Sequence, residues 1–213
     1  MKNYLQKVIL LIGMLFIIST SASAQRLIDM TTTIFDGAWE PISGSQILGA
    51  SDDGAVTVDW SSLGFNFMYD NIQRTGAYVS ANAYFLFSPG NYYYGYGAND
   101  LYQNYPGAHI IAGDGYTRQN IVYEVQGTAP NRVLVFQWNN YDLYYGNNTG
   151  TYSDFQIRLH ETSNIIEIVF GDVDCGSYSN WTSGTYYHRF LGFSTSNSAE
   201  WINIEPASSA ESF

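Results

Sequence analysis

The residues best suited to chemistry in this chain are two glutamates, Glu161 and Glu167. Glycoside hydrolysis needs two carboxylates that flank one groove, and a turn at Thr162 to Asn164 would place these two on neighbouring strands. However, Glu161 falls next to the turn, and Glu167 shares a strand face with Ile165 and Val169. This placement favours solvated strand carboxylates, so a glycoside-active enzyme is the third of the functions considered.

No nucleophile motif accompanies these carboxylates. The sequence has no G-x-S-x-G, and His109, His160 and His188 lack the spacing of a zinc site. The single cysteine, Cys175, lies in no reactive motif, and one cysteine allows no disulfide within the chain. We therefore expect a protein that is not an enzyme.

Two acidic loops have a composition that could hold Ca²⁺. "SDDG" places Asp52 beside Asp53, and "GDVDCG" places Asp172 near Asp174, in both cases next to glycines. Ca²⁺ takes oxygen ligands from loops of this kind, but neither loop has the distal glutamate or the length of an EF-hand. The alternative is that these aspartates are turn residues that cap backbone amides.

Three segments are rich in tyrosine and could bind a ligand. Tyr and Trp give contact area at little entropic cost, and the Gly, Ser and Asn among them give adaptable hydrogen bonds. We expect them to stack on a glycan or to contact a protein surface; the alternative is that they cover sheet edges. The candidates are Tyr92, Tyr93, Tyr94, Tyr96 and Tyr102 in the first segment, Tyr141, Tyr144 and Tyr145 in the second, and Tyr178, Trp181 and Tyr186 in the third.

The N-terminus has the pattern of a secretory signal peptide. Lys2 and Lys7 flank an apolar run over residues 8–18, which is short for a membrane span, and Ala22-Ser23-Ala24 forms a small-x-small cleavage site. We expect residues 1–24 to be removed and residues 25–213 to form a single domain without membrane insertion. The expected location is secreted or at the cell surface, and at least periplasmic.

The remaining chain is strongly acidic. Both lysines lie before residue 25, so six arginines face 19 acidic residues, a net charge of −13. Such a surface repels nucleic acid and anionic lipid, so neither is an expected partner. With 17% aromatic residues the chain can bury a core and is not a disordered tail.

Alternating apolar residues predict strands throughout this region. In "DFQIRLHE" Phe155, Ile157 and Leu159 share one face, and "GFNFMYD" predicts the same for its aromatic residues. "RVLVFQWNN" is apolar on both faces, as expected of a central strand. The other predicted strands are 83–88, 120–127, 164–171, 188–194 and 201–205. About ten short strands predict an all-β, mainly antiparallel two-sheet sandwich, jelly-roll-like, with long tyrosine-rich loops.

Two stretches carry a family resemblance. "YEVQGTAPNRVLVFQWNN" and "FQIRLHETSNIIEIVFG" resemble a β-sandwich module at the front of many secreted or surface proteins that use the type IX secretion pathway. That module often precedes fibronectin type III repeats and a C-terminal sorting domain. The residues that carry the resemblance are Gly127 to Val133, Gln137, Trp138, Phe155, Gln156, Leu159, Glu161 and Thr162.

The resemblance implies an architecture and a location, and it implies no reaction. In the "GTAPNR" turn we expect structural roles: Pro130 fixes φ, Asn131 favours a turn, and Arg132 donates to carbonyls across the hairpin. Ala83 stands where the module usually has glycine, so we expect the turn at Asn82 to differ. No fibronectin repeat or sorting domain follows in the sequence, which leaves open a small stand-alone protein or a fragment.

The sequence therefore supports three functions in order. The first is a non-catalytic extracellular interaction or adhesion module that binds a glycan or another surface ligand through its tyrosine-rich loops. The alternative is a purely structural spacer domain of a larger cell-surface protein. The third is the glycoside-active enzyme described above.

Overall fold

The computed structural model describes residues 31, 33, 38–87, 105–110, 115–143, 152–174, 191–195 and 201–204. Nearly all regular structure in these ranges is β, apart from one short 3₁₀ turn, η2 (Ser61–Leu63). The strands are β1 (Ser45–Ser51), β2 (Ala55–Asp59), β3 (Met68–Tyr69), β4 (Ile72–Gln73), β5 (Gly76–Ser80), β6 (Tyr84–Leu86), β7 (Gly107–His109), β8 (Gly115–Gln126), β9 (Val133–Leu143), β10 (Tyr152–His160), β11 (Ile166–Asp174), β12 (Leu191–Ser194) and β13 (Trp201–Ile204).

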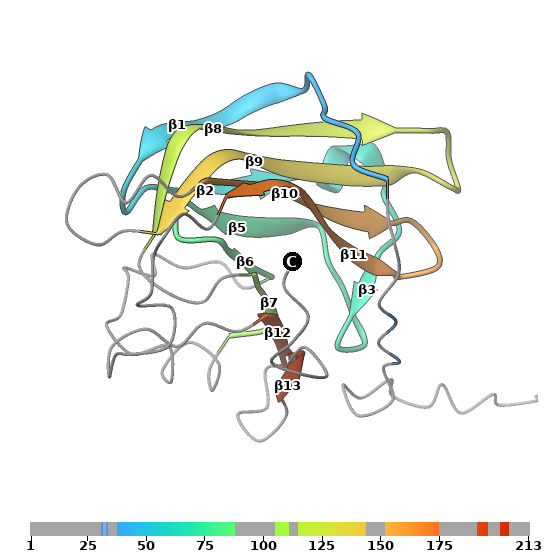
Figure 1. Cartoon of the computed structure of the whole chain (residues 1–213). Helices are drawn as coiled ribbons and strands as arrows, with labels where there is room; N and C mark the ends of the chain where they lie inside the picture. The colour runs from blue at the N-terminus through green and yellow to red at the C-terminus, as the bar shows by residue number, and fades with distance from the viewer. Residues whose placement is uncertain are drawn as a thin grey trace, which may run out of the picture.

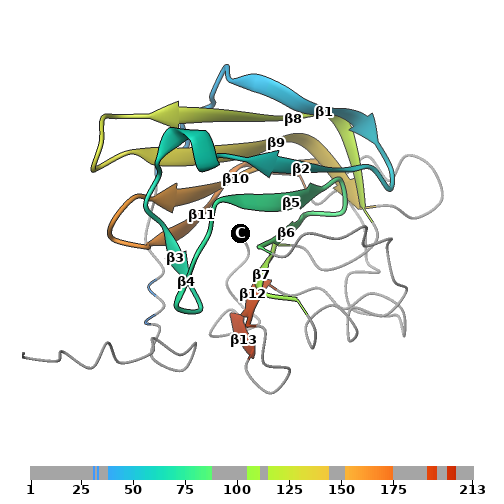
Figure 2. The ribbon, with the colours of Figure 1, turned by 180° about the vertical axis from the view of Figure 1, so that it is seen from behind.

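Hydrogen bonding assembles these strands into two large antiparallel sheets. The five-stranded sheet has the order β1-β8-β9-β10-β11, and the six-stranded sheet has the order β13-β12-β7-β6-β5-β2. Figure 1 shows the five-stranded sheet lying over strands β2 and β5, and Figure 2 shows the same layers from behind with the β3–β4 hairpin at one end. The predicted all-β, two-sheet antiparallel sandwich is confirmed.

The core lies between the two sheets. The inward side chains predicted for β10, Phe155, Ile157 and Leu159, are all completely buried. Trp138 of β9 stacks on Phe155 with ring centroids 4.9 Å apart. The Trp138 indole N–H donates to the Ser80 carbonyl of β5 at 2.9 Å. The sheets are therefore joined by a buried hydrogen bond as well as by apolar burial.

The segment "GFNFMYD" confirms the predicted facing and corrects the predicted strand. Phe65, Phe67 and Tyr69 are buried while Asn66 and Met68 are exposed. Only β3, at the end of this segment, is a strand. The preceding residues run extended along one end of the sandwich, where their backbone groups bond to turns and side chains instead of a neighbouring strand. In this segment the alternation of apolar and polar residues reflects which side chains are buried, and it does not require pairing with a neighbouring strand.

The turn between β5 and β6 contains an alanine in the left-handed backbone conformation. Ala83 has a φ of 61°, and its N–H donates to the Ser80 carbonyl at 3.1 Å. Alanine therefore occupies here a backbone conformation that favours glycine. The turn is buried, with Asn82 only 2% exposed, so packing around it holds Ala83 in a conformation that alanine disfavours.

An extended segment before β1 crosses the outer face of the five-stranded sheet. We call residues 38–44 the strap. Figure 1 shows it as the blue trace that descends from the start of β1 over β8 and β9. Its residues Ala38 and Glu40 accept hydrogen bonds from β10. Its position explains why β9 is apolar on both faces: Val135 faces outward, away from the core, and is still only 1% exposed. No helix in the described ranges is long and apolar enough to cross a membrane.

Candidate functional site

The two ends of the sandwich carry different groups of polar residues. The β8–β9 turn, the β10–β11 turn and η2 lie at one end, which we call the hairpin end. The β1–β2 turn and the β5–β6 turn lie at the other end, where β9 and β11 finish and β8 and β10 begin; we call it the loop end.

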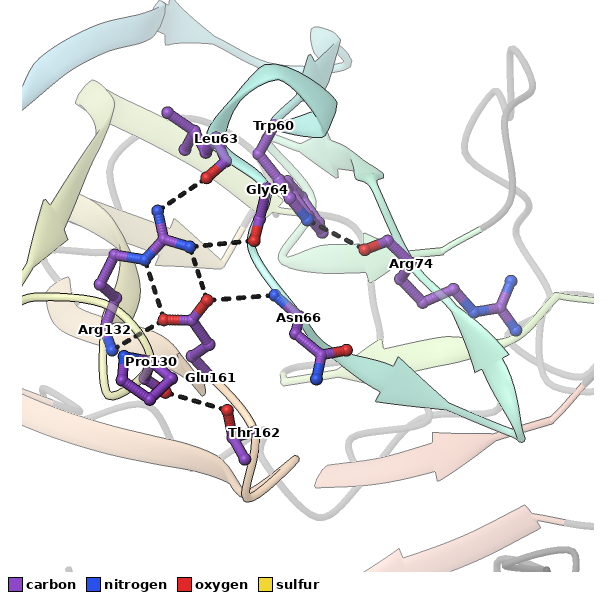
Figure 3. Close-up of polar contacts among 9 residues, drawn as sticks. All are labelled: Trp60, Leu63, Gly64, Asn66, Arg74, Pro130, Arg132, Glu161 and Thr162. Carbon is purple, nitrogen blue, oxygen red and sulfur yellow. Dashed lines mark hydrogen bonds and ion pairs between the residues drawn. The ribbon is translucent and has the colours of Figure 1, made fainter.

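An ion pair between Arg132 and Glu161 organises the hairpin end. Arg132 directly precedes β9 and Glu161 directly follows β10, so antiparallel pairing of these strands brings them together. The Arg132 Nε donates to Glu161 Oε2 at 2.8 Å, and Nη2 donates to Oε1 at 2.5 Å. Figure 3 shows this forked arrangement, which is the strong, bidentate form of an arginine–carboxylate pair.

The same guanidinium ties the five-stranded sheet to the segment that follows β2. Its Nη1 donates to the Leu63 carbonyl at 2.8 Å, and its Nη2 donates to the Gly64 carbonyl at 3.1 Å. It also lies 5.5 Å from the centroid of the Phe65 ring. Arg132 was expected to donate across its own hairpin. Its carbonyl acceptors instead belong to the η2 region, so its structural role extends beyond the hairpin.

Glu161 has no capacity left for acid–base or nucleophilic chemistry. Besides Arg132, its oxygens accept from the backbone N–H groups of Arg132 at 3.1 Å and Asn66 at 3.3 Å. The hydrogen bonds from Arg132 are the main cause that lowers the pKa of Glu161 to about 2. A general acid would need a raised pKa. The interpretation of Glu161 as a solvated strand carboxylate is also wrong, because it is 5% exposed.

The second candidate carboxylate, Glu167, is paired on the outer face of the sheet. Its Oε2 lies 3.1 Å from His160 Nε2 and 3.8 Å from Arg158 Nη1. Both neighbours lie on the same outer face of the sheet as Glu167. The pairing of both glutamates gives the glycosidase interpretation no support from these residues.

The β10–β11 turn completes the hairpin end. Thr162 and Asn164 both have left-handed backbones, with φ of 67° and 59°. The Thr162 hydroxyl donates to the Pro130 carbonyl at 2.9 Å, and Asn164 Oδ1 accepts from the Met68 N–H at 2.8 Å. A β-branched residue rarely adopts this conformation. Its contact with the neighbouring hairpin, drawn in Figure 3, shows what compensates for the strain.

Asn82 organises the loop end. Its Oδ1 accepts from the Gly115 N–H at 2.8 Å, where β8 begins, and its Nδ2 donates to Asp53 Oδ1 at 3.4 Å. The neighbouring Ala81 carbonyl accepts from the Thr117 hydroxyl at 3.2 Å. The β5–β6 turn is therefore bonded both to β8 of the opposite sheet and to the β1–β2 turn.

The two acidic loops do not come together. Asp52 and Asp53 follow β1, while Asp172 and Asp174 belong to β11, and these strands form opposite edges of the five-stranded sheet. Burial, followed by the charge of Asp53, raises the pKa of Asp52. Within the described ranges no three His, Cys, Asp or Glu side chains gather as metal ligands. The Gly54 N–H is capped by the Ser51 hydroxyl at 2.8 Å, and not by an aspartate.

An ion pair that the sequence did not reveal lies beside this turn. Arg118 of β8 donates to Asp142 Oδ2 of β9 through Nε at 3.0 Å and Nη2 at 2.5 Å. Its guanidinium also lies 4.6 Å from the centroid of the Tyr116 ring. The sequence contained no signal for this pair, because the partners are far apart along the chain and are joined only by the register of β8 with β9.

A buried serine and histidine lie on β12 and β7. His109 Nε2 is 3.0 Å from the Ser194 hydroxyl oxygen, and that hydroxyl donates to the Tyr105 carbonyl at 2.5 Å. The hydroxyl proton of Ser194 therefore points to a carbonyl. A serine nucleophile would instead donate this proton to the histidine. Burial lowers the pKa of His109 to about 3, so the ring is neutral. The pair serves to join β7 to β12.

Of the predicted ligand-binding tyrosines, only Tyr141 lies within the described residues, and its assignment to an exposed loop is wrong. Tyr141 is 1% exposed and packs edge-on to Phe155, with ring centroids 5.6 Å apart. Tyr141 belongs to β9, and its side chain is part of the core. Its ring lies against the backbone of Gly115, where an added Cβ would collide with it. The candidates that lie outside the described residues are Tyr92, Tyr93, Tyr94, Tyr96, Tyr102, Tyr144, Tyr145, Tyr178, Trp181 and Tyr186.

The strands that lead into two of these segments finish next to each other. Tyr152, the first residue of β10, pairs with Asp174, the last residue of β11, and β9 ends beside the start of β10 at Leu143. Tyr152 itself is 42% exposed. The first tyrosine-rich segment, between β6 and β7, is attached at a different place. Leu86 pairs with Gly107 at the ends of β6 and β7 that point away from the loop end.

Comparison with known proteins gives one match. A family model described as "NIDO related" matches residues 30–211, which is most of the chain. Neither the curated proteins nor the solved structures include a significant match. The matched range contains both large sheets and both ends of the sandwich.

Proposed function

The chain belongs to the NIDO-related family, a family of extracellular-type, non-enzymatic modules, and we propose that it binds a glycan or another surface ligand through its tyrosine-rich segments. The binding residues would be Tyr144 and Tyr145 after β9, and Tyr178, Trp181 and Tyr186 after β11. The tyrosines between Asn91 and Gln103 are a separate part of the proposal, because their segment is anchored at Leu86 and Gly107, away from the loop end.

The observation that carries the proposal is the position of the strand ends. Segments 144–151 and 175–190 start or finish at Leu143, Tyr152 and Asp174, which are neighbours at one end of the five-stranded sheet. Binding residues are commonly placed on connecting segments that a rigid sandwich holds together at one end. Tyr152 adds an exposed aromatic side chain at the base of both segments.

The chemistry of these segments favours a neutral, hydroxyl-rich ligand. Tyrosine and tryptophan rings stack on apolar faces of sugars, and the asparagines and serines between them bond to hydroxyl groups. The net charge of −11 for the whole chain argues against an anionic ligand. Calcium could assist through Asp172 and Asp174, which lie where segment 175–190 begins.

We further propose that the protein is exported. A signal peptide over residues 1–24 followed by one module over residues 25–213 is compatible with a family match that begins at residue 30. Use of the type IX secretion pathway is the finer proposal, and it depends on the "GTAPNRV" and "FQIRLHET" signatures. A spacer domain in a surface protein is the second candidate, favoured by the paired and buried state of the polar residues at the hairpin end.

The test is a glycan array probed with the purified chain and three single variants. Tyr144→Ala and Trp181→Ala should each reduce binding at least tenfold, while Ile72→Ala, which removes an exposed side chain at the hairpin end, should leave binding unchanged. Absence of any signal across the array and on cell-surface protein would favour the spacer function. Addition of EDTA to the same array tests calcium, since a calcium-dependent signal would disappear.

A further inference from the structure

Three hydrogen bonds hold the strap, and each uses a backbone group of the strap. The Ala38 carbonyl accepts from Arg158 Nη2 at 3.2 Å, and the Glu40 carbonyl accepts from Gln156 Nε2 at 2.8 Å. The Ile42 N–H donates to Gln137 Oε1 at 2.9 Å. Every second residue of the strap is therefore bonded to a side chain of β9 or β10, as expected for an extended segment.

The sheet residues beneath the strap are buried although they face away from the core. Val122, Gln137, Gln156 and Val169 are paired across β8 to β11 and are 6%, 2%, 0% and 6% exposed. None of the four belongs to the cluster of side chains between the sheets. The strap thus occupies a built site, in which two glutamines lie between two valines.

A chain of side-chain hydrogen bonds fixes the orientation of both glutamines. Arg158 Nε can only donate, and it donates to Gln156 Oε1 at 2.8 Å. The Gln156 amide nitrogen then donates to Gln137 Oε1 at 2.6 Å, and the Gln137 nitrogen donates to Asn139 Oδ1 at 2.6 Å. The site therefore presents preset donors and one preset acceptor to whatever backbone lies across it.

One strap side chain has a dedicated position. The Trp39 ring lies directly on Gly171 of β11, where an added Cβ would come within 2.5 Å of the ring. Glycine at this position thus leaves room for an aromatic ring against the strand. The site recognises the backbone of an extended segment and one aromatic side chain.

We propose that the outer face of the five-stranded sheet is a peptide-binding site, and that the strap is its resident, displaceable ligand. The external ligand would be an extended peptide segment of another protein chain with an aromatic residue in the position of Trp39. This differs from addition of a strand to a sheet edge, because side chains on the sheet face bind the peptide backbone. The proposal is independent of ligand binding by the tyrosine-rich segments.

The strap competes with any external peptide because it is part of the same chain. A tethered segment acts at an effective concentration in the millimolar range, so an external peptide binds the wild-type protein weakly. Removing the Trp39 ring weakens the strap while leaving Gln137, Gln156 and Arg158 in place. The full-length Trp39→Ala variant is therefore the receptor for the test.

The experiment measures fluorescence anisotropy of a labelled peptide with the sequence of residues 36–45, DGAWEPISGS. We expect this peptide to bind the Trp39→Ala variant at least tenfold more tightly than the wild-type protein. The same peptide with alanine in place of tryptophan should lose at least tenfold in affinity. A double variant that also carries Gly171→Ala should lose the binding of the tryptophan peptide, because the added methyl group fills the position of the ring.

Two outcomes would overturn the proposal. One is a folded Trp39→Ala variant that binds the peptide no better than wild type; the other is equal binding by the Gly171→Ala double variant. A second measurement uses the wild-type chain and covers the case in which the variants do not fold. The exchange rate of the Ile42 amide hydrogen should not depend on urea concentration and should exceed the rates of the β9 amides. If the Ile42 amide exchanged only through global unfolding, the strap would not be displaceable.

Discussion

At both the hairpin end and the loop end, side-chain hydrogen bonds connect segments of the two sheets, but the side chains that do so differ in charge. At the hairpin end a charged pair, Arg132 with Glu161, bonds to backbone groups of Leu63, Gly64 and Asn66, and each partner satisfies the charge of the other. At the loop end a neutral side chain, Asn82, joins the β5–β6 turn to β8 and to the β1–β2 turn. The charged pair connects the β9 and β10 ends to the η2 region. At the loop end, by contrast, lie the strand ends that lead into two tyrosine-rich segments.

This difference is consistent with the proposal that the hairpin end stabilises the fold and the loop end carries the ligand-binding segments. The residues that carry the resemblance to a known module, around Arg132 and Glu161, have structural roles. The residues proposed to bind a ligand belong to segments 144–151 and 175–190, which adjoin strand ends at the loop end. Changes at the hairpin end should therefore alter stability without altering ligand binding, and changes in segments 144–151 and 175–190 should do the reverse.

The largest effect is expected for Glu161→Ala. It leaves the Arg132 guanidinium unpaired and removes the acceptor of two backbone N–H groups. The melting temperature should fall by roughly 10 °C, the size expected when one partner of a buried, hydrogen-bonded pair is lost. Differential scanning calorimetry measures this. Glu124→Ala, which removes a carboxylate from β8, is the control, and an equal fall in both variants would contradict the account.

Asn82→Ala should have the next largest effect. The variant leaves the Gly115 N–H buried without an acceptor, which costs about 1–3 kcal/mol of the free energy of unfolding. Urea denaturation checks this, with Asn82→Asp as the matched variant because it retains an oxygen acceptor. A cost below about 0.5 kcal/mol would show that Asn82 does not organise the loop end.

Acid should weaken the loop end before the hairpin end. His109 lies beside the β5–β6 turn, and its folded pKa of about 3 is below the ordinary value of 6.5. The unfolded chain therefore binds a proton first, and stability falls from pH 6.5 downward by up to about 1.4 kcal/mol per pH unit. The contribution of Glu161 is present above pH 4.5 and is lost only as the pH falls towards 2.

The measurement is urea denaturation between pH 7 and pH 5. His109→Gln should remove most of the pH dependence in this range. A wild-type stability that stays constant down to pH 5 would show that His109 is not buried in its neutral form.

The smallest effect is expected for Thr162→Asn. Asparagine tolerates the left-handed backbone better than a β-branched residue, and its side chain can still donate to the Pro130 carbonyl. The free energy of unfolding should rise by about 0.5 kcal/mol. Thr57→Asn, on an exposed position of β2, should lower it instead because asparagine disfavours strands. A loss of stability at both positions would argue against strain at Thr162.

Local alternation predicted much of the fold but could not predict how distant residues meet. The periodicity of β8 to β11 identified the strands of the central sheet and the inward face of Phe155, Ile157 and Leu159. It could not identify the strap, because residues 38–44 have no regular structure and are bound by side chains far along the chain. The partners Arg118 and Asp142 were missed for the same reason, since only the register of β8 with β9 joins them.

The candidate site was less predictable than the fold. Tyr141 has the same sequence surroundings as Tyr144 and Tyr145, yet it belongs to β9 and is buried. Composition alone does not show where a strand ends and an exposed segment begins. The sequence places Glu161 close to Glu167 across a short turn, which suggests two carboxylates near each other. The pairing of Glu161 with Arg132 depends on a contact between two hairpins that spacing does not reveal.

The most direct test of the proposed division of labour is to measure ligand binding and melting temperature on the same two variants, Trp181→Ala and Arg132→Lys. Lysine cannot reproduce the forked pair with Glu161, so Arg132→Lys should lower the melting temperature and retain full binding to the glycan or surface protein found for the wild type. Trp181→Ala should lose at least tenfold in binding at an unchanged melting temperature. Loss of binding in proportion to the fall in melting temperature in both variants would contradict the account.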